Sequence, residues 1–294
     1  MGTELFREDF TGGLVTEGPG APWRLRPVDG LTGGDGLVRG GPDGLVVVPS
    51  AADPRTRRPA FSEPKPGPDG AAPLHLRWGA FTTDGTAGAR GGFTAEPGEL
   101  LTVTAEMGLR GFGLRSHSYE DVAEPTAAPG LGAGGLISVD LETGIIFDFF
   151  LTHSRLYAVY ERLALRPDVP FASFTYCVPV TDRAPGQLHR LGISYDAAAG
   201  TVHWKADGKQ VLSVDRIGFR ALDAQWLRRD NGGQEEAVRP RGLSFGLGLF
   251  LERWFGQGVR LSVRDLRVST SPADAPATSL AGSAATYPAG SRDS

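Results

Sequence analysis

The sequence predicts an all-β protein, either a sandwich or a barrel of antiparallel strands. Short segments rich in strand-forming residues recur along the chain and are separated by turn residues. Glycine and proline are abundant, with 42 and 22 residues in a chain of 294, and they show no collagen-like repeat. A helical period of apolar residues fits the chain poorly throughout. Length does not decide the number of domains, and we expect a single β-sandwich domain over residues 1–270.

The predicted strands follow one another at short intervals, and glycine or proline punctuates the segments between them. In the first half of the chain they are Leu5–Phe10, Leu45–Pro49, Leu74–Thr82, Leu100–Met107 and Gly135–Asp140. Residues 144–163 add two aromatic strands joined by a turn. In the second half they are Phe171–Val178, His189–Tyr195, Thr201–Ala206, Gln210–Asp215, Leu243–Leu251 and Val259–Ser269.

The connections also carry predictions. Asp207-Gly208, between VHWKA and KQVLSVD, predicts a hairpin with a type I′ turn, because that turn needs positive φ at both central residues. Two excursions rich in Pro, Gly and Ala, Asp53–Gly70 and Glu120–Gly135, are long enough to cover a site, although plain surface loops are commoner. Residues 271–294 are rich in Ala, Ser and Pro and are predicted to form a flexible tail.

Composition excludes several partners. The formal net charge of −4 and the lack of a concentrated Lys/Arg segment argue against a nucleic-acid partner. No stretch approaches eighteen apolar residues and the N-terminus has no signal-peptide pattern, so we expect a cytoplasmic protein with no membrane partner. The single cysteine, Cys177, excludes an internal disulfide, and a buried strand thiol is usually inert.

No metal-ligand pattern stands out in the sequence. His and Cys never occur at zinc spacing, and no Asp/Asn/Gly loop matches a calcium hand. We therefore expect no cofactor, while a calcium ion held by loop carboxylates stays open. The sequence does not indicate whether the protein forms oligomers.

Two segments resemble a known fold family. Residues 187–196 (QLHRLGISYD) and 200–211 (GTVHWKADGKQV) resemble the late strands of concanavalin A-like, laminin G-like jelly rolls, where W-H-x-x-x-I-x-Y-D leads into V-x-W-x-x-D-G-x-x-V. Residues 6–10 (FREDF) are similar to the opening strand of the same superfamily, whose first and last strands pair. The resemblance implies a jelly-roll β-sandwich of two antiparallel sheets. More closely, FDFFLTHSRLYAVYERL resembles an uncharacterised family of actinobacterial and fungal proteins, which implies no activity.

Enzymes of this fold include the family 16 glycoside hydrolases, which carry E-x-D-x-E or E-x-D-x-x-E on one strand. Period-two spacing puts those carboxylates on one face of the sheet. The nearest match here is Ser138–Glu142 (SVDLE), with Ser138 at the position of the nucleophile. The following Thr143-Gly144 suggests that residues 140–144 form a turn. Ordinary retaining glycoside hydrolysis is therefore not expected.

The central hairpin, residues 144–163 (GIIFDFFLTHSRLYAVYERL), carries charged residues inside apolar runs. An unpaired buried carboxylate is costly, so something polar is arranged there. A two-residue turn at His153-Ser154 places Asp148 opposite Val159, on the face of Tyr157 and Glu161. A three-residue turn places Asp148 opposite Ala158, beside Tyr160 and Arg162. The sequence leaves both registers open, as well as the interpretation that Asp148 only satisfies a structural pair.

These considerations give the candidate site residues. The catalytic candidates are Asp148, Glu161, Tyr160, Arg162 and His117. His117 belongs to a polar cluster, RSHSYED at residues 115–121, where Glu120 or Asp121 could orient it as a general base. The substrate-binding candidates are Tyr157, Phe150, Tyr176, Trp254 and Trp78. His153, His189 and His203 are expected to be structural.

Two classes of function fit these residues. The first is an intracellular enzyme with an aromatic-lined pocket on the concave sheet, a cofactor-independent lyase, isomerase or cyclase of secondary metabolism. The Ala/Gly/Arg/Pro bias of the composition suggests an actinobacterial source for it. The alternative is a lectin-like carbohydrate-binding module or a degenerate family 16-like glycoside hydrolase. An enclosing pocket with a perturbed carboxyl group favours the enzyme.

Overall fold

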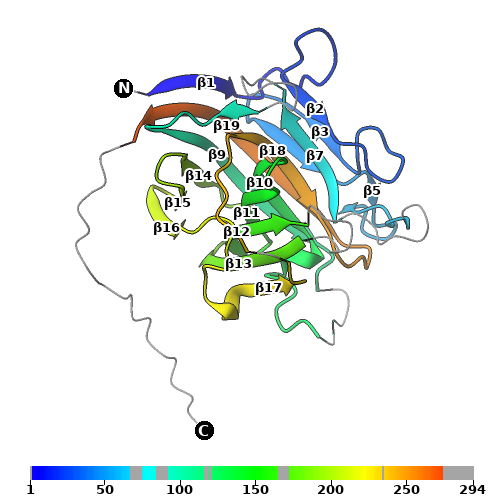
Figure 1. The fold of residues 1–294 in the computed structure, drawn as a ribbon. Coiled ribbons are helices and arrows are strands. Elements are labelled where there is room, and N and C mark those ends of the chain that lie inside the picture. Colours follow the sequence, from blue (N-terminus) through cyan, green and yellow to red (C-terminus); the bar gives the residue numbers. More distant parts are fainter. Residues whose placement is uncertain are drawn as a thin grey trace.

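Two antiparallel sheets packed face to face make up the protein in the computed structural model (Figure 1). The structure describes residues 2–66, 75–83, 92–115, 119, 121–164, 172–233 and 235–273. Within this range the regular structure is strand apart from short 3₁₀ turns such as η3 (Pro129–Leu131) and η4 (Ala224–Trp226). None of the described helices is long and apolar enough to span a membrane. The predicted all-β jelly-roll sandwich is confirmed.

Sheet A has the strand order β16-β15-β14-β9-β19-β4-β3, with β1 beside β19. Its strands are β1 (Thr3–Glu8), β3 (Leu37–Arg39), β4 (Leu45–Val48), β9 (Glu99–Phe112), β14 (His189–Asp196), β15 (Thr201–Ala206), β16 (Lys209–Val214) and β19 (Gly258–Pro272). Sheet B has the order β17-β13-β12-β11-β10-β18-β7-β2, with β8 beside β18. Its strands are β2 (Trp23–Leu25), β7 (Leu76–Thr82), β8 (Phe93–Thr94), β10 (Ala133–Asp140), β11 (Ile145–Leu151), β12 (Arg155–Leu163), β13 (Ala172–Asp182), β17 (Leu227–Asp230) and β18 (Gly242–Phe250). The short strands β5 (Ala51–Ala52) and β6 (Pro59–Ala60) pair separately.

Two local predictions are confirmed. The first and last strands pair antiparallel, with Thr3 opposite Thr270 (Figure 1). The hairpin β15–β16 turns at Asp207 and Gly208, whose φ values of 51° and 79° are both positive. Strand β19 runs to Pro272, two residues beyond the predicted domain end, and residues 274–294 of the predicted tail lie outside the described residues.

The core between the sheets explains the direction of the side chains in β11. Phe147 and Phe149 are fully buried there, and Phe147 packs edge to face on Trp204 of β15, with ring centroids 5.6 Å apart. Trp204 Nε1 also donates a hydrogen bond to the backbone oxygen of Asp148 at 3.0 Å. Because side chains alternate along a strand, Asp148 must then point to the other face of sheet B. We call this face, which points away from sheet A, the outer face.

The outer face of sheet B is itself apolar over much of its area. A second apolar cluster, separate from the core, contains Leu76, Ala133, Ile137, Val139 and Phe250, with Phe81, Ile146 and Phe150 packed against it. The rings of Phe150 and Phe250 lie 4.5 Å apart, next to Gly135. A Cβ atom at Gly135 would come within 2.7 Å of Phe250, so glycine lets the ring lie close to the sheet. Sheet B therefore carries apolar side chains on both of its faces here.

Candidate functional site

The register of the central hairpin is the one with the two-residue turn. Leu151 lies opposite Leu156 and Asp148 opposite Val159. The N–H of Thr152 donates to the backbone oxygen of Arg155 at 2.8 Å, which closes the turn at His153-Ser154. The three-residue alternative is excluded. Asp148 therefore shares the outer face with Tyr157 and Glu161.

Cross-strand pairing extends this face into β13 and β17. Glu161 on β12 lies opposite Thr175 on β13, which lies opposite Arg229 on β17. In the neighbouring row, Asp148 is followed by Val159 and then Cys177. The outer face thus carries a polar row beside a mainly apolar one, and the polar row ends at the edge strand.

A shallow pocket lies over these rows, with a cavity volume of about 30 Å³ within about 370 Å³ of empty space that includes the open solvent at its mouth. It is lined by His75, Pro129, Phe150, Val159, Glu161, Thr175, Cys177, Arg228, Arg229 and Glu252. We call it the groove pocket. Three segments that are far apart in the sequence form its rim: β17, the loop around η3, and the residues that follow β18.

Glu161 is the carboxyl group of the groove pocket whose pKa is moved to near neutral pH. Its side chain is buried, and Thr175 Oγ1 donates a hydrogen bond to Glu161 Oε2 at 2.8 Å. Burial raises the pKa of the Glu161 carboxyl to about 7, although the Thr175 hydroxyl and Arg229 favour the ionised form. Near neutral pH this carboxyl can therefore both give and take a proton.

Glu252 behaves in the opposite way. Burial opposes its ionisation, but the guanidinium groups of Arg228 and Arg229 outweigh burial and lower the pKa of the Glu252 carboxyl. Arg228 Nη2 lies 3.3 Å from Glu252 Oε2, and Arg229 Nη2 lies 3.0 Å from Glu252 Oε1. The pocket therefore contains two carboxyl groups with pKa values moved apart, which is the usual arrangement of an acid and a base.

His75 and Cys177, which also line the pocket, are neutral near pH 7. Burial lowers the pKa of His75 to about 4, and its ring stacks on Phe250 with centroids 5.7 Å apart. Burial raises the pKa of the Cys177 thiol to about 12, which agrees with the inert thiol expected from the sequence. Tyr157 lies at the rim, where its hydroxyl donates to the backbone oxygen of Ala127 at 2.8 Å.

Asp148 lies beneath the pocket rather than in its lining. Its Oδ1 accepts a hydrogen bond from the Ser138 N–H at 3.0 Å, at the point where backbone partners of β10 and β11 are interrupted between Leu136 and Val139. Burial, and to a smaller extent the charge of Glu161, raises the pKa of Asp148 well above its usual range. Asp148 is thus held by a backbone donor of the neighbouring strand β10.

Two catalytic candidates are corrected by the structure. Tyr160 and Arg162 point to the opposite side of sheet B from Glu161. Tyr160 Oη accepts a hydrogen bond from the Gly218 N–H at 2.6 Å, and Arg162 Nη2 pairs with Glu236 Oε1 at 2.6 Å. The register decides this, because residues 160 and 162 alternate with residue 161 along the strand. The hypothetical Asp148–Arg162 pair does not form.

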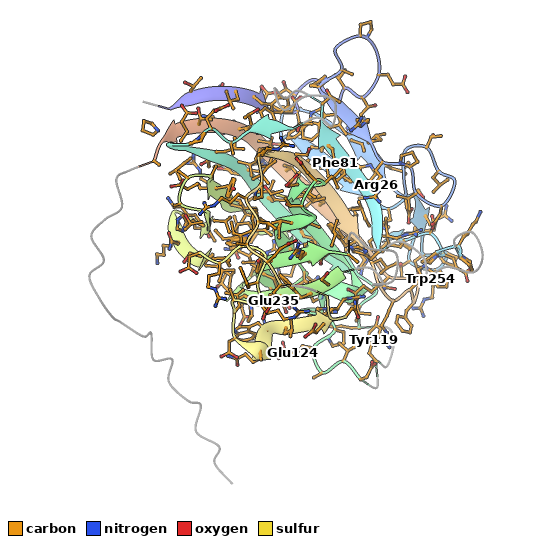
Figure 2. The ribbon with its side chains drawn as sticks, in the orientation of Figure 1. Arg26, Phe81, Tyr119, Glu124, Glu235 and Trp254 are labelled. Atoms are coloured by element: carbon orange, nitrogen blue, oxygen red, sulfur yellow. The ribbon has the colours of Figure 1, made fainter. Side chains whose placement is uncertain are left out.

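Three substrate-binding candidates also lie elsewhere. Trp78 is fully buried in the core, and Tyr176 stacks there on Tyr160 with ring centroids 6.3 Å apart. Trp254 follows β18 and donates from Nε1 to the backbone oxygen of Phe61 at 2.8 Å. In Figure 2 it lies to the right of β12 and β13. Of the aromatic candidates, Phe150 lines the groove pocket and Tyr157 lies at its rim.

The remaining histidine and carboxylate candidates do not join this site. His117 and Glu120 lie outside the described residues. Asp121 forms an ion pair with Arg253, with its Oδ2 2.6 Å from Arg253 Nη1. His189, expected to be structural, is buried and its Nδ1 lies 2.7 Å from Asp207 Oδ2.

The acidic segment at 138–142 runs from the end of β10 into the turn predicted at residues 140–144. Asp140 accepts hydrogen bonds from the N–H groups of Glu142 and Thr143, and Glu142 pairs with Arg241. Ser138 is fully buried. This strand therefore does not present a pair of carboxylates on one face. In the part of the chain that the structure describes, His, Cys, Asp and Glu form no group of three or more that could hold a metal ion.

Sequence reasoning missed five pocket residues: His75, Thr175, Arg228, Arg229 and Glu252. Thr175 could have been found, because it falls within a predicted strand. Glu252 could also have been noticed as a charge directly after the apolar strand 243–251. The two arginines lie on a strand of four residues, too short to show a period.

The comparisons with known proteins give one family and a set of similar folds. The profile of a protein family, described as "Family of unknown function (DUF6081)", matches residues 7–272. Uncharacterized protein L829 of Acanthamoeba polyphaga mimivirus is 27% identical over 176 residues, a match that covers 41% of this chain and 40% of the viral protein. The chain therefore matches less than half the length of that curated relative.

Solved structures superpose on this chain at low sequence identity. Alginate lyase A1-II′, a member of polysaccharide lyase family 7, superposes with a TM-score of 0.50 at 13% identity over 86% of this chain and 96% of the lyase. A GH16 protein of the Bacteroides ovatus mixed linkage glucan locus superposes with a TM-score of 0.47 at 10% identity over 90% and 99% of the two chains. The likeness to the lyase is evidence for the fold alone.

Proposed function

This chain belongs to the family of unknown function DUF6081, and we propose that it binds a saccharide in the groove pocket and acts on it by proton transfer through Glu161. One observation carries the proposal: a buried carboxyl with a pKa of about 7 lies in a solvent-open pocket, held by Thr175. The similar folds include a polysaccharide lyase and a GH16 protein, which makes a saccharide the first ligand to test.

The chemistry follows from the two carboxyl groups. Glu161 supplies or removes the proton at the glycosidic oxygen or at a ring carbon, a step worth about 10²–10⁴-fold in rate. Glu252 stays ionised between Arg228 and Arg229 and holds their guanidinium groups beside the saccharide. Thr175 fixes the orientation of Glu161. Glu161 and Glu252 are therefore not the counterpart of the acidic strand of family 16, because the matching segment of this chain forms a turn at residues 140–144.

The test is a turnover assay on a panel of neutral and acidic oligosaccharides. Reducing ends report hydrolysis, and ultraviolet absorbance of an unsaturated product reports elimination. The Glu161→Gln variant is expected to keep saccharide binding and to lose turnover by about 10²-fold or more. Glu142→Gln is the matched control, since Glu142 lies outside the groove pocket and pairs with Arg241. Full turnover in Glu161→Gln, or no saccharide bound by the wild type, would contradict the proposal.

The apolar cluster favours a second candidate. Leu76, Ile137, Val139 and Phe250 would suit the hydrocarbon skeleton of a small molecule better than a sugar ring. Under this alternative the protein is a cofactor-independent lyase, isomerase or cyclase of secondary metabolism, acting in the cytoplasm, and Glu161 remains its acid/base group. Tight binding of apolar small molecules with no binding of saccharides would favour it.

A further inference from the structure

Among the residues that the structure describes, the charged side chains that line the groove pocket do not balance. Two guanidinium groups, Arg228 and Arg229, face one ionised carboxylate, Glu252. Glu161 adds no charge while it holds its proton, and His75 is neutral above about pH 4. The pocket is therefore positive in mildly acidic solution, although the whole chain has a formal net charge of −4. A local field of this sign attracts anions.

The two arginines are also within reach of a ligand. The side chains of Arg228 and Arg229 are 38% and 35% exposed, and that of Glu252 is 29% exposed. By contrast, the Arg77 side chain, which pairs with Asp29 and Asp35, is 1% exposed. The groove arginines thus differ from a guanidinium group that is committed to holding the fold together.

The arginines already hold a carboxylate, that of Glu252. A planar carboxylate matches the fork of guanidinium N–H donors, and this match is what makes arginine selective for such groups. A carboxylate on a ligand can meet the same donors beside Glu252 or in its place.

We propose that the groove pocket takes an acidic saccharide, with a sugar carboxylate bound at Arg228 and Arg229 and with a proton held on Glu161 while the ligand is bound. This inference names the substrate class of the proposed function and rests on that function for the saccharide. It does not rest on turnover.

Electrostatic repulsion is the reason why Glu161 keeps its proton while the ligand is bound. A bound carboxylate and an ionised Glu161 would repel each other within one pocket, so the ligand prefers the protonated form of Glu161. By reciprocity, affinity for the ligand falls as the pH rises through about 7, where Glu161 loses its proton. Above that pH the loss approaches about tenfold per pH unit.

The other titratable groups that face Glu161 come from every neighbouring strand. Asp148 of β11 has a pKa raised by burial, Cys177 of β13 has a pKa of about 12, and Glu252 has a lowered pKa. Glu252 and Cys177 therefore do not change charge between pH 6 and 8. The pKa of Asp148 is also raised by burial. The Glu161→Gln variant therefore tests whether Glu161 or Asp148 causes the pH dependence of ligand binding.

The experiment is calorimetric titration of the full chain with an acidic and a neutral oligosaccharide of equal length, at pH 6 and pH 8. The wild type is expected to bind the acidic ligand more tightly at pH 6, and Glu161→Gln is expected to lose that pH dependence. Arg228→Met should lower the affinity for the acidic oligosaccharide by about tenfold or more and leave the affinity for the neutral one unchanged. Arg264→Met is the matched control, since Arg264 lies on sheet A and pairs with Asp43.

The outcomes separate the two proposals. If neither oligosaccharide binds, the proposed function fails. If both bind equally well, and Arg228→Met does not distinguish them, only the present inference fails. A pH dependence that persists in Glu161→Gln would overturn the role of the Glu161 proton. Equal affinity for a sulfated sugar of the same length would overturn the assignment to a carboxylate. Melting curves of each variant confirm that it is folded.

Discussion

Replacing Glu161 by glutamine is expected to make the folded protein more stable at pH 8 and to leave its stability unchanged at pH 4. Burial raises the pKa of Glu161 from 4.5 to about 7, so the folded protein holds this proton more tightly than the unfolded chain does. A carboxyl with a raised pKa contributes fully to stability below pH 4.5, and the contribution is lost as the pH rises through about 7. Glutamine cannot ionise and can still accept the hydrogen bond from Thr175.

The size of the effect follows from the pKa difference. A shift of this size corresponds to about 3 kcal/mol of unfolding free energy, at about 1.4 kcal/mol per pKa unit. For a protein of this length that is roughly 6–12 °C in melting temperature. A gain of stability on removing a working group is the usual trade between stability and activity.

The assay is urea denaturation of the wild type and of Glu161→Gln across the range from pH 4 to pH 8. Glu142→Gln is the control, because Glu142 is a half-exposed carboxylate paired with Arg241 and should show no such pH-dependent gain. A Glu161→Gln protein that is less stable than the wild type at pH 8 would refute the reasoning. So would a difference between the two that does not change with pH.

Two further predictions concern the support of the pocket. Asp148→Asn should leave the unfolding free energy nearly unchanged or raise it at neutral pH, because an amide oxygen still accepts the hydrogen bond from the Ser138 N–H. Asp148→Leu removes that acceptor and should lower the unfolding free energy by about 1–3 kcal/mol. Urea denaturation measures both effects. Destabilisation by Asp148→Asn as large as that by Asp148→Leu would contradict this. Gly135→Ala should lower the unfolding free energy by about 1–3 kcal/mol, because the new Cβ would come within 2.7 Å of Phe250. Gly12→Ala is the control and should have little effect, since a Cβ there would have nothing within 4 Å. Equal melting temperatures of the two variants would argue against a Phe250 ring packed on the sheet.

The fold followed from local signals that do not depend on distant partners. Asp207-Gly208 prefers a type I′ turn in almost any context, so the hairpin could be placed to the residue. Alternation along β11 places Phe147 and Phe149 on one face and Asp148 on the other, whichever strands pair with it. The short strands, β17 among them, gave no such signal because a few residues cannot show a period.

The site followed from the sequence only in part. Glu161 was recognised as a charge inside an apolar strand, and it lies in the groove pocket. Tyr160 and Arg162 could not be assigned to a face, because turns of two and three residues reverse the assignment. Arg229 and Glu252 meet through strand pairing between segments distant in sequence, which no local pattern predicts.

The pairing of β1 with β19 has a practical consequence for handling the protein. Both ends of the sandwich lie together on sheet A, with Glu4 opposite Ser269 (Figure 1). The groove pocket, by contrast, lies over the outer face of sheet B. A tag or surface tether attached before β1 or after β19 therefore leaves from the side away from the pocket. Because the two strands are neighbours, a short linker could also join them, and the chain could be reopened at the Asp207-Gly208 turn as a circular permutant with the same groove.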